Sequence, residues 1–206
     1  MLIGVDVETG GLNSPKTDAL LTAYLQSYAV ERHVLRGTFR LVPHNSLSLT
    51  IQPEGLDVSE EALKINKIDV KEHTLRAISR KDAARLLAQF ISSVEYGLPK
   101  STSIWWKRLQ TPTAFVGWNV HFDVGFLNQL LTETTTDVRL PYRNVDVHSL
   151  YYVHRLNDMP EGSLSLSNAA RYFGILKEHE GIPHTAAGDV HITMEVFNCC
   201  LSRQQR

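Results

Sequence analysis

Two carboxylates stand two residues apart close to the beginning of the sequence. Asp6 and Glu8 end the apolar run 2–8, and Thr9–Gly11 follow it, a pattern typical of a strand that leads into a turn. Alternate residues of a strand leave the same face, so the two side chains lie together and repel each other unless a cation sits between them. Hard divalent cations prefer such oxygen ligands. A chain of this acid content also produces acid-x-acid pairs by chance, so the pair alone leaves both interpretations open.

Three more residues are candidates for the same chemistry. Asp123 follows an apolar strand expected over 113–118 and falls in the first turn of a helix, where an acid commonly caps unpaired N–H groups. His184 precedes the helix expected over 186–201, and Asp189 lies in its first turns. Histidine is the natural proton acceptor near neutral pH, although one histidine among nine is ordinarily a surface residue. Each residue alone therefore admits a structural explanation.

The strands and helices that must position these residues follow a different order in the two parts of the chain. Residues 20–52 have the pattern of an antiparallel meander, and strands alternate with helices afterwards. The expected strands are 2–8, 20–30, 33–43, 46–52, 113–118 and 144–147, and the expected helices are one from Ser59 to about Lys67 and those over 81–94, 122–131, 148–156, 165–172 and 186–201. Residues 95–112 are expected to form a loop. This order predicts an α/β domain in which helices cover a mixed sheet, with ligands at the carboxyl ends of its strands.

Composition narrows the class of protein. The chain has 206 residues, 43% of them hydrophobic, which suits one globular domain with a full core. Its 21 Lys and Arg residues nearly balance 22 Asp and Glu residues, which excludes a strongly basic protein that coats nucleic acid. No apolar run approaches the roughly 18 residues of a membrane helix, and no basic leader precedes the first strand, so neither a membrane span nor a signal peptide is expected. Cys199 and Cys200 are adjacent, so no disulfide framework is expected and the default compartment is the cytoplasm.

The five candidate residues fall in three ordered motifs. Val5–Leu12 resembles Asp-x-Glu-Thr-x-Gly-Leu, Trp118–Leu127 resembles Asn-x-x-Phe-Asp followed by an apolar helix, and His184–Asp189 matches His-x-Ala-x-x-Asp. In this order they resemble the signatures of the DEDDh branch of the DEDD (DnaQ-like) 3′–5′ exonucleases, and the resemblance covers nearly the whole chain. One departure is the second strand, where Ala19–Tyr24 lacks the acidic residue that the family usually carries. This departure leaves all five candidate positions intact.

The resemblance implies a fold, a site and a cofactor. The implied fold is ribonuclease H-like, a mixed and mostly five-stranded central sheet flanked by helices, in a single exonuclease domain over residues 1–206. The implied catalytic residues are Asp6, Glu8, Asp123, His184 and Asp189. The implied ligands of two divalent metal ions, Mg²⁺ or Mn²⁺, are Asp6, Glu8, Asp123 and Asp189, while His184 would take the proton from the attacking water. The substrate contacts that we expect are the Thr9 backbone, Leu12 and Phe122.

The implied activity is metal-dependent hydrolysis of phosphodiester bonds from the 3′ end of nucleic acid, which releases 5′-mononucleotides, with single-stranded DNA as the favoured substrate. An RNA-processing exoribonuclease of the same family is one alternative. A proofreading or nucleic-acid-binding subunit of a polymerase complex is another, and the corresponding partner is a polymerase or a second copy of the chain. A phosphatase of the haloacid dehalogenase type is disfavoured, because that class has Asp where Glu8 stands and no use for His184.

One cluster lies outside these motifs. Trp105–Arg108 has the composition of an accessory nucleic-acid contact, in which aromatic rings stack on bases and cations meet phosphates. The same residues would also serve to fasten a long loop, which is the interpretation that we favour from the sequence.

Overall fold

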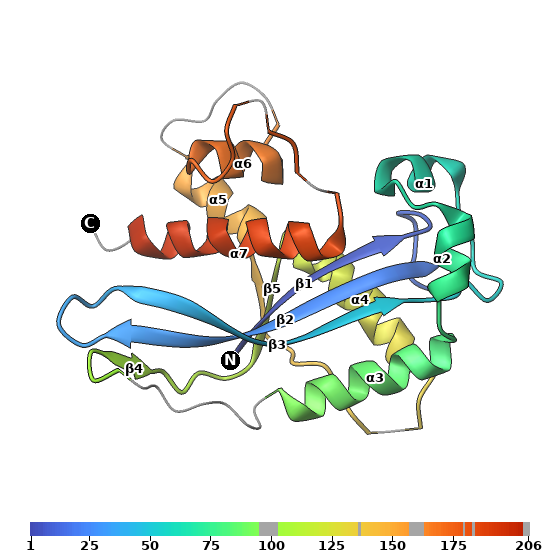
Figure 1. The fold of residues 1–206 in the computed structure, drawn as a ribbon, viewed down its shortest axis with the longest axis horizontal. Helices are drawn as coiled ribbons and strands as arrows, with labels where there is room; N and C mark the ends of the chain where they lie inside the picture. Colours follow the sequence, from blue (N-terminus) through green and yellow to red (C-terminus); the bar gives the residue numbers. More distant parts are fainter. Residues whose placement is uncertain (95–102, 136, 157–162, 179, 183, 204–206) are drawn as a thin grey trace.

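The sheet is centred on β1 (Leu2–Thr9), the strand that carries the first two carboxylates (Figure 1). The computed structural model describes residues 1–94, 103–135, 137–156, 163–178, 180–182 and 184–203. The other strands in these ranges are β2 (Leu20–His33), β3 (Phe39–Thr50), β4 (Trp106–Arg108), β5 (Ala114–Gly117) and β6 (Asn144–Asp146). The helices are α1 (Glu60–Asn66), α2 (Val70–Arg76), α3 (Arg80–Ser93), α4 (Val120–Leu131), α5 (Val147–His154), α6 (Leu166–Tyr172) and α7 (Ala186–Arg203).

The strand order places three carboxyl ends at one edge of the sheet. The order is β3-β2-β1-β5-β6, with β4 paired to the far end of β2. β1, β2 and β3 form the predicted antiparallel meander, whereas β5 and β6 run parallel to β1. This arrangement confirms the predicted α/β domain with a mixed sheet between helices. Over the described residues the sheet has six strands, one more than the mostly five-stranded sheet that the resemblance implies, and β4 is the addition.

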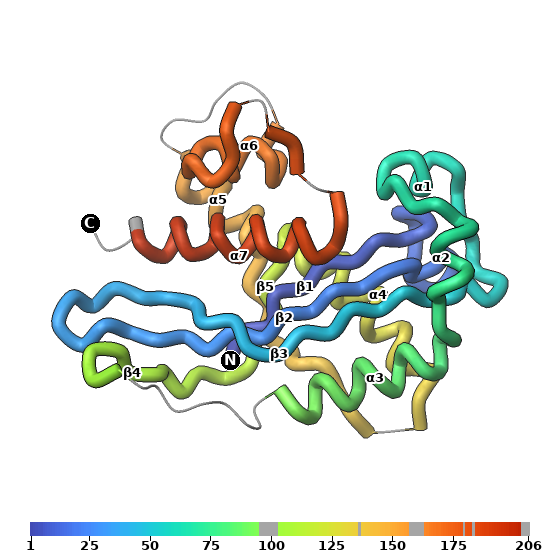
Figure 2. The backbone as a smooth tube through the Cα atoms, in the orientation of Figure 1, coloured from blue at the N-terminus to red at the C-terminus, as the bar shows by residue number. Residues whose placement is uncertain are grey.

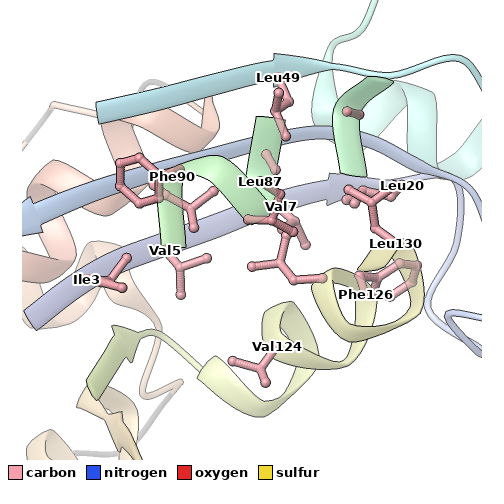
Figure 3. Close-up of a cluster of buried hydrophobic side chains, with 14 of the residues drawn as sticks. Ile3, Val5, Val7, Leu20, Leu49, Leu87, Phe90, Val124, Phe126 and Leu130 are labelled. Carbon is pink, nitrogen blue, oxygen red and sulfur yellow. The ribbon is translucent and has the colours of Figure 1, made fainter. Parts of the chain in front are cut away.

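Helices cover the two faces of the sheet with separate clusters of buried side chains. α3 and α4 pack on the face from which Ile3, Val5 and Val7 project, as Figure 3 shows. α5, α6 and α7 pack on the opposite face. Since successive residues of a strand alternate between faces, Asp6 and Glu8 leave the face that α7 covers. β1 therefore buries its apolar residues on one side and directs its two acids toward α7 on the other.

Local signals set the ends of several helices. Ser59, Ser79 and Ser165 each accept a hydrogen bond from the backbone N–H three residues later, and α1, α3 and α6 begin at the next residue. The helix start predicted at Ser59 is therefore confirmed. Among the helices that the structure describes, none combines the length and the apolar character needed to cross a membrane.

Several predicted elements differ from the structure. Residues 39–50 of the strands expected over 33–43 and 46–52 form one strand, β3, because an irregularity opposite Gln26–Tyr28 of β2 accommodates an extra residue without ending the pairing. His33 instead ends β2, and residues 34–38 connect the two strands. The sequence also gave no signal for α2, which begins after Asp69, whose carboxylate accepts hydrogen bonds from two backbone N–H groups of its first turn. Such short elements depend on capping contacts that a periodic pattern does not reveal.

The loop predicted over 95–112 contains a strand. β4 pairs antiparallel with Glu31–His33 at the end of β2 and so extends the sheet beyond the meander (Figure 2). The first part of that predicted loop, 95–102, lies outside the described residues. The three residues of β4 show no alternation of their own, so the pairing with a distant segment is what identifies this strand.

Candidate active site

Three carboxylates converge where β1 ends beside the first turns of α7. One ligand oxygen from each of Asp6, Glu8 and Asp189 lies within 4.8 Å of the other two. α7 comes this close because Gly4 has no side chain, and a Cβ built there would lie 2.9 Å from Cγ1 of Val190. A larger residue at position 4 would push α7, and Asp189 with it, away from the strand.

Asp123 reaches the same strand from α4. β5 pairs with β1 only from Leu2 to Gly4, so the Val7 N–H lies beyond the end of that ladder. Asp123 is 3% exposed, and its Oδ1 accepts a 3.0 Å hydrogen bond from this N–H. The bond ties α4 to β1 at the residue between the two strand carboxylates. Asp123 therefore does more than cap its own helix.

Burial raises the pKa of all four acids and is the largest cause in each case, and repulsion by other carboxylates adds to the rise for Asp6, Glu8 and Asp123. The pKa of Asp6 is held well above its usual range by burial and then by the other three carboxylates. Burial and then the charge of Asp189 raise the pKa of Glu8 from 4.5 to about 7. Burial also raises the pKa of Asp123, against an opposing effect of backbone hydrogen bonds. Burial raises the pKa of Asp189, against an opposing effect of His184.

The cluster has the properties of a cation site. Oδ1 of Asp189 is buried and has no hydrogen-bond partner among the described residues. Four neighbouring carboxylates that have lost hydration are costly as anions, and a divalent cation relieves both their repulsion and the lost hydration. Hard cations such as Mg²⁺ and Mn²⁺ take carboxylate oxygens. The residues present therefore fit a divalent metal ion, with Asp6, Glu8 and Asp189 as its nearest ligands.

His184 lies at the rim of this cluster. Its backbone is left-handed, with φ of 49°, and its side chain is exposed just before α7 begins. The next residue, Thr185, accepts a 3.2 Å hydrogen bond from the Gly188 N–H and so caps the helix. His184 lowers the pKa of Asp189, which places the imidazole within electrostatic range of the carboxylates. The structure thus brings together all five residues of the three motifs, with the four acids inside and the histidine outside.

The three residues expected to contact substrate differ in exposure. Thr9 is buried, its hydroxyl donates a 2.6 Å hydrogen bond to the Gly11 carbonyl, and its own carbonyl accepts a 2.9 Å bond from Asn66 Nδ2 of α1. Leu12 follows this turn and is 79% exposed. Phe122 is half-buried in the first turn of α4. Thr9 therefore shapes the turn, while Leu12 and part of Phe122 are open to a ligand.

The motifs do not mark one further acid at this edge. Asp146 ends β6, and its carboxylate accepts a 2.9 Å hydrogen bond from the Asn119 N–H and a 2.6 Å bond from the Ser149 hydroxyl. It caps α5 and fastens the turn before α4, and its charge contributes to the raised pKa of Asp123. The end of the strand expected over 144–147 is the sequence signal that identifies this position.

Comparison with known proteins gives relatives along nearly the whole chain. No protein-family model matches the sequence. The chain is 27% identical over 194 residues to ribonuclease T of Wigglesworthia glossinidia brevipalpis, a match that covers 94% of this chain and 80% of that protein. It is also 27% identical over 194 residues to ribonuclease T of Histophilus somni (strain 129Pt), with coverage of 94% and 79%.

Among solved structures, E. coli exonuclease I with zinc and single-stranded DNA resembles this chain with a TM-score of 0.67 at 18% identity. That match covers 100% of this chain and 41% of the exonuclease I chain, so this chain spans about two fifths of that protein's length. The likeness confirms the predicted ribonuclease H-like fold. Together with the similarity to the ribonuclease T proteins, it supports a DEDD-type 3′–5′ exonuclease of the DnaQ-like superfamily.

Proposed function

We propose that this chain removes nucleotides one at a time from the 3′ end of single-stranded DNA or RNA and releases 5′-mononucleotides. The observation that carries the proposal is the convergence of Asp6, Glu8 and Asp189 within 4.8 Å, with a buried oxygen of Asp189 that has no partner in the described part of the chain. The catalytic residues in this proposal are Asp6, Glu8, Asp123, His184 and Asp189, in a single domain over 1–206 that works in the cytoplasm.

The four acids would hold two Mg²⁺ or Mn²⁺ ions. Asp6 is the natural shared ligand, because its pKa responds to the charges of the three other carboxylates from both sides of the strand. Glu8 and Asp189 would help to hold one ion, and Asp123 from α4 would help to hold the other. Two such ions, when bound, stabilise negative charge on the attacking and leaving oxygens of a phosphodiester.

His184 is the proposed proton acceptor for the attacking water. Its exposed position at the rim leaves the imidazole accessible to water, and the adjoining α7 cap holds the backbone that carries it. An imidazole must be neutral to accept a proton, and bound cations favour the neutral form by offsetting the neighbouring carboxylates. The protonated imidazole then returns its proton to solvent.

The turn after β1 is the proposed seat of the terminal nucleotide. The Thr9–Gly11 turn is fixed by the Thr9 hydroxyl and by Asn66, so the backbone there is preorganised next to Glu8. Leu12 stands exposed at the end of the turn, where an apolar side chain can wedge against a base. Phe122 offers part of a ring for stacking, and stacking on an aromatic face is tolerant of sequence.

The test uses 5′-labelled single strands of matched DNA and RNA with Mg²⁺ or Mn²⁺. We expect a ladder that shortens from the 3′ end, with 5′-mononucleotides as products. His184→Ala lowers the rate by about a hundredfold or more, and Asp6→Asn abolishes it at every metal concentration. His121→Ala, an exposed histidine on α4, is the matched control and keeps wild-type activity. Absence of any 3′ shortening, or full activity in His184→Ala, would overturn the proposal.

The same assay decides between the substrate classes. The relatives named ribonuclease T favour RNA, whereas the single-stranded DNA held by exonuclease I favours DNA. A proofreading or nucleic-acid-binding subunit of a polymerase, or a homodimer, is the alternative arrangement. A nucleic-acid-binding subunit would bind a strand end without turnover by the isolated chain, whereas a proofreading subunit or a homodimer would still shorten the strand.

A further inference from the structure

The β2–β3 hairpin continues well past the end of β1 and carries β4 along its side. We call residues 29–42 together with 103–109 the arm. β1 pairs with β2 only as far as Tyr28, so the arm projects beyond the centre of the sheet, at the left of Figures 1 and 2. The arm concentrates positive charge in a chain whose charges balance overall. Its one acid is Glu31, and its cations are Arg32, Arg36, Arg40, Lys107 and Arg108.

Two of these cations have a structural role. Glu31 is 3% exposed, and its carboxylate accepts hydrogen bonds of 2.6 and 2.9 Å from Arg40 and forms an ion pair of 3.8 Å with Arg108. Arg40 also lies over the ring of Trp106, with 4.2 Å from its guanidinium carbon to the ring centroid. This network fastens β4 to the hairpin, as the sequence-based interpretation of the tryptophans expects.

The other three cations have no such partner. Arg32, Arg36 and Lys107 are exposed, and none of them forms an ion pair within the described ranges. Arg32 and Lys107 stand directly opposite each other in the β2–β4 ladder, where like charges reduce the stability of the pairing. They line a hollow of about 270 Å³ together with Val34 and Leu109. A destabilising pair of cations that flanks a hollow is suited to an anion from outside the chain.

An aromatic ring lies beside this basic pair. Trp105 is 49% exposed, and its carbonyl accepts a 2.8 Å hydrogen bond from the Val34 N–H, which holds it next to the hollow. Its ring is parallel to that of His33, with an interplanar angle of 8° and centroids 6.4 Å apart. Exposed aromatic rings next to unpaired cations are how proteins hold single strands, by stacking bases and meeting phosphates.

We propose that the arm is an accessory binding site for single-stranded nucleic acid, in which Arg32 and Lys107 bind phosphates and Trp105 stacks on a base. Exposed apolar residues at the tip, such as Leu35, would also suit a protein partner. The three cations that form no ion pair within the described part of the chain favour nucleic acid. An apolar protein surface would bury them without a counter-charge, whereas phosphates supply one.

The position of the arm predicts which substrates reach it. Asp6 pairs with Tyr24 of β2, and Arg32 lies eight residues farther along the strand, so both leave the same face. Eight residues of strand span about 27 Å, which a stacked single strand covers with about eight nucleotides. If the 3′ end lies at the carboxylates, as the proposed function states, the arm contacts only longer strands. This part of the inference rests on the proposed function.

The test measures binding of a labelled strand of about 20 nucleotides to the full chain, with divalent metal withheld so that no hydrolysis occurs. The logarithm of the binding constant falls with that of salt concentration by about 0.7 per phosphate contact. Arg32→Ala/Lys107→Ala therefore lowers the magnitude of this slope by about 1.4, and Trp105→Ala weakens binding about fivefold or more. Lys81→Ala/Arg139→Ala removes two exposed cations outside the arm and leaves the slope unchanged.

Charge reversal separates binding from folding. Lys107→Glu creates an opposite-charge pair with Arg32, so it raises the temperature of unfolding while it weakens binding. An unchanged salt slope in the double variant overturns the proposal. If the arm variants change the oligomeric mass of the purified chain in solution but not the salt slope, the proposal is also overturned, and the arm is assigned to contact between copies of this chain.

Hydrolysis of a trinucleotide reports on the proposed function alone. With metal present, all arm variants cleave it at the wild-type rate, because it is too short to reach the arm. If the wild-type chain cleaves no oligonucleotide while the salt slopes respond as expected, the proposed function fails and the arm site stands. If cleavage occurs and the wild type and the double variant have equal salt slopes, the proposed function stands and the arm site fails.

Discussion

Replacement of Glu8 by Gln in the metal-free protein is expected to raise stability, and to do so only at higher pH. Burial and the charge of Asp189 raise the pKa of Glu8 from 4.5 to about 7 in the folded protein. The folded state therefore holds a proton that the unfolded state releases between these two pH values. Because the folded state binds more protons, the free energy of unfolding falls as pH rises through this window and is constant above it.

The magnitude follows from the size of the change in pKa. A rise from 4.5 to about 7 corresponds to about 3.4 kcal/mol, at 1.36 kcal/mol for each pH unit. Glu8 is only half-buried, so screening by solvent reduces this value, and we take about half of it, 1–2 kcal/mol. Glu8→Gln removes the ionisable group. The variant is therefore more stable than the wild type by about 1–2 kcal/mol at pH 8, and nearly equal to it at pH 4.5.

The assay is urea unfolding at pH 4.5 and pH 8 in the presence of a chelator. Glu61→Gln, which removes an exposed carboxylate from α1, is the matched control, and its stability stays within about 0.5 kcal/mol of wild type at both pH values. Mg²⁺ or Mn²⁺ at 100 times its Kd stabilises the wild type by about 2.7 kcal/mol, and Glu8→Gln loses most of this gain. A Glu8→Gln variant that is less stable than wild type at pH 8 without metal would refute the electrostatic reasoning.

Substitutions at three further positions test separate contacts. At pH 4.5, where repulsion between the carboxylates is weakest, Asp123→Ala leaves the buried Val7 N–H without its acceptor and lowers the free energy of unfolding by about 1–3 kcal/mol in urea titrations. Asp123→Asn keeps an acceptor oxygen and costs less. Gly4→Ala places a methyl group against α7 and destabilises the chain by about 1–3 kcal/mol by the same measurement, with loss of metal affinity in calorimetry. Glu31→Gln removes the counter-charge of two arginines in the arm, so proteolysis near β4 becomes faster while hydrolysis of a trinucleotide is unchanged.

Much of the candidate site could be predicted from sequence because its parts obey short-range rules. Asp6 and Glu8 share a face because a strand repeats every two residues, and the helix predicted over 186–201 puts Asp189 in a first turn. The periodicity of a strand or helix does not predict how two elements pack against each other. The approach of α7 depends on the absence of a side chain at Gly4, and the place of Asp123 depends on an N–H left over where β5 stops pairing.

The parts that the sequence did not predict depend on distant partners. β4 exists because its backbone pairs with the end of β2, and its three residues carry no alternation of their own. The single strand β3 depends on an irregularity that lets the pairing continue past Pro43. Asp146 looks like an ordinary strand end until its carboxylate is seen to hold the turn before α4. In each case the deciding energy comes from a hydrogen bond to a segment far away in sequence.

The near balance of acids and bases conceals a separation of charge along β2. At one end, beside Tyr24, which pairs with Asp6, four carboxylates including Asp6 form a desolvated cluster. About 27 Å away, Arg32 and Lys107 have no counter-charge among the described residues. Without metal the first end repels a phosphate, whereas the cations of the arm attract one. Two divalent cations would offset the charge of the four carboxylates and so admit the 3′ terminus. We therefore expect the rate of association to depend on salt with or without metal, and hydrolysis to depend on metal at every salt concentration.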